Sequence, residues 1–154
     1  MTVSIQVEIA GVAQIKSVLQ TLANLGKDMT PITEAIGEEF VSRVAFNFRD
    51  SHDSNGNPWK PLKVRVGGQP LVDTGRLRGS ITYETTRDGL VLDVGTNVDY
   101  APLHQFGGMS KFGGRQAYVP ARPFLPIGDI PQPWIDAAED IAAKKLNAIL
   151  NALV

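Results

Sequence analysis

The segment Tyr100–Pro126 constrains this chain most strongly, because glycine and proline divide it into pieces too short for one continuous helix or strand. Its glycines allow left-handed backbone conformations, while its prolines fix φ and remove hydrogen-bond donors. The segment also carries four large aromatic side chains: Phe106, Phe112, Tyr118 and Phe124. Such side chains must be buried against the rest of the fold or against another molecule. We therefore interpret the segment as a contact loop.

Hydrophobic periodicity predicts the elements before this loop. Apolar residues alternate with polar ones over Thr2–Ile9, which is typical of a strand with one buried face. Spacings of three and four over Val12–Leu25 predict a first helix. Thr30 as N-cap and Pro31 as first residue begin a second helix that ends near Asp50. This helix has one apolar row: Ile32, Ile36, Phe40, Val44 and Phe48.

Further elements follow on either side of the loop. Asp73 or Thr74 can cap a short helical turn. Ile81–Thr86 and Leu90–Thr96 then predict a β-hairpin, and a last amphipathic helix begins at Pro133. The order predicts an α+β fold: a small antiparallel-rich sheet, made of the N-terminal strand and the hairpin, packed with two N-terminal helices and a C-terminal helix.

Length and composition narrow the class of protein. A chain of 154 residues suits a single domain over residues 1–154. The absence of cysteine excludes disulfides, thiolate metal sites and cysteine nucleophiles. No stretch approaches the ~20 apolar residues of a spanning helix, so we expect a soluble cytoplasmic product with no membrane partner.

Charge is distributed unevenly along the chain. Residues 1–59 carry a formal charge of −3, residues 60–127 carry +4 and residues 128–154 carry −2. Acidic ends around a basic middle favour attraction between copies of the chain or to a partner. A nucleic-acid-binding module using the basic middle is an alternative, in which Arg76 and Arg78 would meet phosphates, although such modules usually carry a larger basic excess.

Two motifs invite chemical interpretations. Asp53, Asn55 and Asn57 alternate as in a calcium loop, but the leading carboxylate and the closing glutamate of such a loop are missing. We predict a turn at Asn55–Gly56 anchored by Trp59, with no metal. Likewise Gly107–Gly114 lacks the ending of a phosphate-binding loop, so it is interpreted as an irregular loop.

Histidine raises a second alternative, a small hydrolase or nuclease using His104 with Asp99. A spacing of five does not place these two residues on one helical face, and no serine stands in a G-x-S-x-G context. A structural role for His104, in a short helical turn over residues 100–107, is favoured. Three side chains of that turn would then pack inward: Tyr100, Leu103 and Phe106.

Four ordered motifs together resemble the phage virion morphogenesis family, the tail-completion proteins of Mu-like and related contractile-tailed phages and prophages. They are Phe46 with Gly56–Leu62 (GNPWKPL), Leu71–Ile81 (LVDTGRLRGSI), Val94–Gly108 (VGTNVDYAPLHQFGG) and Val119–Ile127 (VPARPFLPI). The resemblance covers about 80 residues plus the flanking helices.

The resemblance implies a fold like that of tail terminator or neck proteins and a structural, non-enzymatic function without a cofactor. Such a protein completes the tail and enables head–tail joining. It would form a homo-oligomeric ring, hexameric to match the tail, with tail-tube and head-side connector proteins as partners and DNA reachable only through the lumen. Its location would be the head–tail junction of the virion, after assembly in the host cytoplasm.

The loop and the resemblance nominate two sets of residues. Those expected at subunit, neck or tail contacts are Arg76, Arg78, Phe106, Phe112, Tyr118, Arg122 and Phe124. Those expected to have structural roles within the motifs are Trp59, Asp73, Gly75, Leu77, Tyr100, His104 and Gly107. Phe106 and Phe124 are equally compatible with an ordinary core.

Overall fold

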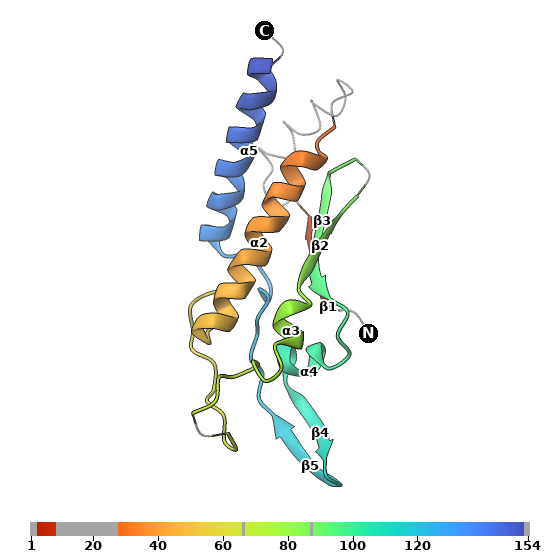
Figure 1. Cartoon of the computed structure of the whole chain (residues 1–154), viewed down its shortest axis with the longest axis vertical. Helices are drawn as coiled ribbons and strands as arrows, with labels where there is room; N and C mark the ends of the chain where they lie inside the picture. Colours follow the sequence, from red (N-terminus) through yellow and green to blue (C-terminus); the bar gives the residue numbers. More distant parts are fainter. Residues whose placement is uncertain (1–2, 9–27, 66, 87, 153–154) are drawn as a thin grey trace. The chain divides into compact units, whose positions relative to one another are not determined.

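The computed structural model describes residues 3–8, 28–65, 67–86 and 88–152 of the chain (Figure 1). Its elements run β1 (Val3–Glu8), α2 (Thr30–Asp50), α3 (Arg76–Gly79), β2 (Thr82–Thr85), β3 (Val91–Thr96), α4 (Ala101–Phe106), β4 (Gly108–Phe112), β5 (Arg115–Val119) and α5 (Gln132–Ala152). This mixture of helices and two small sheets confirms the α+β prediction. The helix predicted over Val12–Leu25 lies outside the described residues.

Helix α2 carries its predicted apolar row, since all five members are at most 2% exposed. The start of the helix differs from the prediction. Thr30 already lies in the helix, and its N–H donates to Asp28 Oδ1 at 2.9 Å. The Asp28 carboxylate therefore provides the side-chain cap, and not Thr30 as predicted.

The chain divides into two compact units. Unit 1 comprises residues 1–4, 43–81 and 95–129, and unit 2 comprises residues 5–42, 82–94 and 130–154. Strands β1 and β3 and helix α2 each continue from one unit into the other. The prediction of a single domain stays a prediction.

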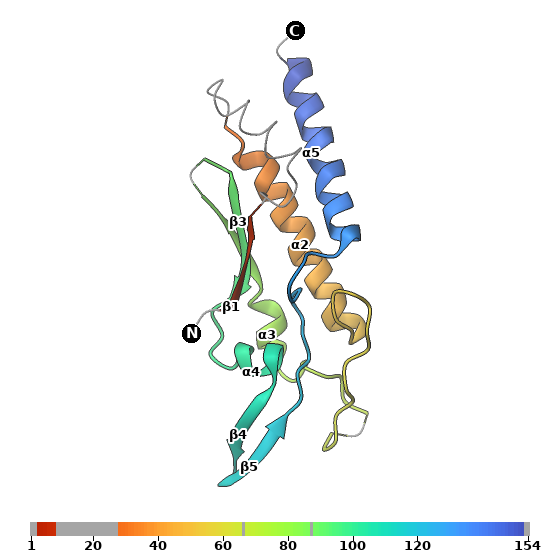
Figure 2. The same ribbon diagram turned by 180° about the vertical axis from the view of Figure 1, so that it is seen from behind.

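Unit 2 packs helices against the three-stranded sheet, whose strand order is β1-β3-β2. Figures 1 and 2 show α2 and α5 side by side. The Phe40 ring of α2 meets Trp134 of α5 with ring centroids 5.3 Å apart. Gly37 faces the sheet so closely that an added Cβ would lie 2.6 Å from the Tyr83 ring. Helix α2 thus contacts both α5 and the sheet.

Unit 1 has a core of aromatic rings in edge-on and tilted contact. Phe48, at the end of α2, contacts Trp59 at 5.7 Å and Phe124 at 5.3 Å between ring centroids. Leu77 of α3 is also buried. Helix α3 starts after Gly75, whose φ of 79° is the left-handed region that favours glycine. Of the two predicted caps, Thr74 lies one residue before the N-cap position, and its Oγ1 accepts the N–H of Arg76 at 3.3 Å, whereas Asp73 pairs with Arg65.

An irregular loop was predicted over Gly107–Gly114, but the structure forms the β4–β5 hairpin there. It pairs Gly108 with Val119 through to Phe112 with Arg115 in antiparallel register. Within unit 1 it extends beyond α4 as a two-stranded ribbon (Figures 1 and 2). Across the described residues, no helix combines the length and apolar character needed to cross a membrane.

Candidate functional site

The candidate site is an exposed apolar surface on the hairpin and on the end of α4. Four large side chains compose it, and the name hairpin surface is used for them below: Phe106 (60% exposed), Met109 (61%), Phe112 (57%) and Tyr118 (65%). Exposed apolar patches on a protein surface mark interaction sites, so these side chains are the candidates for one. Of the predicted docking residues, Phe106, Phe112 and Tyr118 are therefore accessible to a partner.

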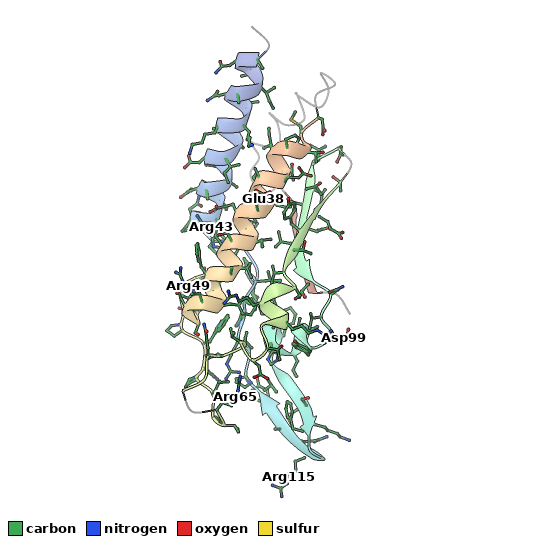
Figure 3. All side chains as sticks on the ribbon, viewed as in Figure 1. Glu38, Arg43, Arg49, Arg65, Asp99 and Arg115 are labelled. Atoms are coloured by element: carbon green, nitrogen blue, oxygen red, sulfur yellow. The ribbon has the colours of Figure 1, made fainter. Side chains whose placement is uncertain are left out.

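Strand pairing divides the hairpin surface between two faces. Cross-strand partners lie on the same face of a hairpin, and successive residues alternate between faces. Met109 pairs with Tyr118, and Lys111 pairs with Gln116, so these four residues share one face. Phe112, paired with Arg115, lies on the opposite face. Arg115 reaches outward at the tip (Figure 3).

Gly107 joins α4 to the hairpin and fixes where the hairpin begins. Its φ is 73°, and an added Cβ would lie 2.8 Å from the Ala121 backbone nitrogen. A side chain at this position would therefore be strained and would collide with the returning strand. The prediction that Tyr100 and Phe106 pack inward is wrong, because these side chains are 38% and 60% exposed, whereas the buried residues of α4 are Ala101 and Gln105.

Phe124 and Arg122 do not belong to the docking surface. Phe124 is fully buried and Arg122 is 6% exposed. Arg122 donates from Nε to the Lys60 carbonyl at 2.7 Å and from Nη2 to the Pro61 carbonyl at 3.1 Å. Both residues are therefore structural, and this corrects their assignment to a contact surface.

The side-chain amide of Gln105 also holds the segment that contains Arg122 and Phe124. Its Oε1 accepts hydrogen bonds from the Phe124 and Leu125 N–H groups at 3.1 Å, and its Nε2 donates to the Leu125 carbonyl at 2.8 Å. Trp59 adds a bond from Nε1 to the Pro123 carbonyl at 2.9 Å. The family-like motifs therefore converge inside unit 1, where they hold the extended segment at residues 122–125.

Two arginines predicted at contacts with other subunits are exposed. Arg76 and Arg78 both lie on the surface of α3, and the Arg76 guanidinium lies 6.0 Å from the centre of the Tyr100 ring. The nearby carboxylate of Asp73 pairs with Arg65 at 2.7 Å. Arg76 and Arg78 thus remain available as charged contacts.

His104 lies half-buried in α4, with the Tyr100 ring edge-on at 5.8 Å between ring centroids. Within the described part of the chain, its Nδ1 is buried without a hydrogen-bond partner. Burial lowers the pKa of His104, and the positive charge of Arg122 lowers it further. Its environment therefore favours the neutral imidazole, and the described residues show no bond to Asp99 that would orient it as a base.

We predict a pH dependence of stability from His104. Because its pKa is below the ordinary value of about 6.5, the unfolded chain binds a proton there that the folded chain resists. The stabilising contribution is therefore present above about pH 6.5 and is lost as the pH falls through this region. Urea midpoints at about pH 7.5 and about pH 5.5 measure the loss. The variant His104→Gln should show a smaller difference between the two midpoints, and an unchanged difference would contradict the assignment.

The turn at Asp53 uses its carboxylate internally. Oδ1 accepts the N–H groups of Asn55 and Asn57 at 2.9 Å, and Oδ2 accepts the Asn57 side-chain amide at 3.0 Å. Burial acts to raise the pKa of Asp53, but these hydrogen bonds outweigh it and lower the pKa. Trp59 is 7% exposed, as expected of the anchor of the turn. The described residues hold no group of three or more potential metal ligands among His, Cys, Asp and Glu.

Sequence reasoning missed three features: the hairpin, Met109 on its surface, and the buried amides of Gln105 and Asn47. The hairpin had a signal, because Gly113-Gly114 is a two-residue turn with φ of 55° and 80° between short β-compatible runs. Asn47 also had one. It lies three residues after Val44 on the apolar side of α2, where a polar side chain needs an internal partner.

Comparison with known proteins identifies the family. The family model described as phage virion morphogenesis matches residues 10–146. The chain belongs to this family. A relative, the Mu-like prophage FluMu G protein 2 of Haemophilus influenzae, is 43% identical over 139 residues, which cover 89% of this chain and 93% of that protein. No solved structure gives a significant match.

Membership of the phage virion morphogenesis family confirms the resemblance found in the four motifs. The chain is accordingly a structural phage protein of virion assembly. Its motif residues Trp59, Leu77 and Gln105 are buried, whereas the hairpin surface is exposed. The motifs therefore maintain the fold that presents this surface.

Proposed function

We propose that this protein completes the phage tail and enables its joining to the head, as a ring-forming component of the neck. The observation that carries this proposal is the hairpin surface, four exposed large apolar side chains on a structural phage protein. Exposure of this kind is costly in water unless a partner covers it. Arg76 and Arg78, also exposed, supply charged contacts of the type enriched at interfaces.

The ring in this proposal is hexameric, with the tail tube on one side and the head-side connector on the other. It lies at the head–tail junction of the finished virion and assembles in the host cytoplasm. DNA passes through its lumen without sequence-specific contact. The protein acts by binding alone, as a non-enzymatic protein with no cofactor.

Depletion of the protein during phage production tests this function. We expect full heads and complete-length tails that stay separate, because the joint between them is missing. Electron microscopy of the lysate counts joined and separate structures. Adding the purified protein to such a lysate should restore infectious particles.

Two outcomes would refute the proposed function. One is a depleted lysate with normally joined particles. The other is a lysate without tails or without heads, since that defect would place the protein earlier in assembly. A His104→Gln protein serves as the control for the enzymatic alternative, because a structural protein should restore joining without this imidazole.

A further inference from the structure

Charge is divided between the two units more sharply than along the sequence. Unit 1 contains ten Lys or Arg and five Asp or Glu residues, a formal charge of +5. Unit 2 contains five basic and eleven acidic residues, a formal charge of −6. Opposite charges of this size attract the unlike units of two copies and repel the like units. The chain therefore favours contacts between unit 1 of one copy and unit 2 of another.

The hairpin supplies the basic side of such a contact. A lone two-stranded hairpin is marginally stable in water and gains from a partner that covers it. Along β5, residues 115–118 are exposed and only Val119 at its base is buried. The face of Met109 and Tyr118 also carries Lys111, two residues further along β4. This face therefore carries two large apolar side chains, Met109 and Tyr118, and one positive charge, Lys111.

Unit 2 contains a groove with the complementary character. It lies between the start of α2 and the end of α5 and has a volume of about 380 Å³. Its apolar lining comes from Pro31, Ile32, Ala148, Ile149 and Ala152. Asp28 and Lys145 also line it. The backbone N–H of Thr30, and then its side chain, lower the pKa of Asp28, so this carboxylate is anionic at neutral pH.

We propose that the Met109–Tyr118 face of one copy docks into this groove on unit 2 of the next copy. This docking rests on the ring proposed above and names its subunit contact. The Met109 and Tyr118 side chains cover the apolar lining, and Lys111 pairs with Asp28. Gln116, the cross-strand partner of Lys111, faces Lys145. Because Gln116 is uncharged, it does not repel the Lys145 ammonium group. Since the Met109–Tyr118 face and the groove are different surfaces, each copy can bind two neighbours, and a rotation between copies that closes produces the proposed ring.

Cysteine cross-linking tests this contact, because the chain has no cysteine of its own. One variant carries Gln116→Cys on the docking face, and a second carries Ala148→Cys in the groove. The two are mixed and oxidised, both as purified proteins and together with tails isolated from depleted lysates, since a ring subunit can require its template. Val64→Cys, at a position in unit 1 that is 92% exposed, replaces Gln116→Cys in the matched control.

We expect the mixed disulfide between positions 116 and 148 to form at least about tenfold faster than the control pair, a ratio that corresponds to 1.4 kcal/mol. A chain carrying both substitutions should give a ladder of cross-linked species that ends at the closed ring. Asp28→Asn, which keeps the capping oxygen and removes the charge, should slow the reaction.

Equal rates for positions 116 and 64, under both conditions, would overturn the docking proposal. A disulfide that forms preferentially between position 116 of two copies would also overturn it, since that result shows a symmetric contact between two hairpins. These failures differ from failure of the proposed function. Separate heads and tails after depletion, with no 116–148 cross-link, would refute only the docking, whereas a cross-link with normal joining after depletion would refute only the function.

Discussion

Replacing Gln105 by leucine should lower the free energy of unfolding by about 3–5 kcal/mol. The side chain is 2% exposed and satisfies two N–H groups and one carbonyl of the segment at residues 124–125. Leucine fills the space but leaves all three groups buried without their partner, at about 1–3 kcal/mol each, and its greater hydrophobicity offsets part of the loss. Urea denaturation of the purified variant measures the difference.

Gln116→Leu is the matched control for this substitution. It makes the same chemical change in β5, where Gln116 is exposed and its side chain has no such network among the described residues. We expect its unfolding free energy to stay within about 0.5 kcal/mol of the parent. A similar loss in both variants would show that the change from amide to leucine, not the network around Gln105, causes the effect.

Helices α2 and α5 and the first hairpin could be predicted from the sequence because their signals are local. The apolar row from Ile32 to Phe48 repeats every four residues, and every member is buried in the structure. In the sequence, Asp88-Gly89 separates two runs with β-strand character, and strands β2 and β3 form from these runs. Periodicity and turn chemistry are sufficient for such elements because both act over a few residues.

The second hairpin was harder to predict because its strands lack the alternation of a half-buried sheet. Residues 115–118 of β5 are all exposed, so no apolar face marks this strand in the sequence. Its evidence is the pair of glycines at residues 113–114, which also occur in irregular loops. Alternation of apolar and polar residues arises when a strand covers the core of its own fold. A strand covered by another molecule, as proposed for β5, need not show this alternation.

The site could be predicted only in part, because residue type does not fix burial. Phe112 and Phe124 are both aromatic residues near glycine or proline, yet one is 57% exposed and the other is fully buried. Arg122 appears suited to an interface, but its guanidinium satisfies the carbonyls of Lys60 and Pro61. These contacts join residues about 60 positions apart, and a single sequence carries no local signal for such pairing.

Replacing Tyr118 by aspartate should abolish particle formation while the protein stays folded. Tyr118 is 65% exposed, so we expect a change in unfolding free energy of no more than about 1 kcal/mol, within the range of β-strand preferences. Losing an aromatic anchor at an interface costs about 2 kcal/mol or more, which weakens each contact about thirtyfold. Every subunit of a ring uses the contact twice, so the losses multiply. The yield of infectious particles after complementation of a depleted lysate measures the effect.

Val64→Asp is the control for this substitution, since it places the same charge at an apolar position of unit 1 that is 92% exposed and outside the hairpin surface. A protein whose function depends on the hairpin surface should tolerate it with nearly full yield. Equal losses from both variants would mean that added negative charge on unit 1, and not the missing tyrosine ring, prevents assembly. Full yield with Tyr118→Asp would exclude the Met109–Tyr118 face of the hairpin from the assembly contacts, because a charge at its centre would then have no effect on assembly.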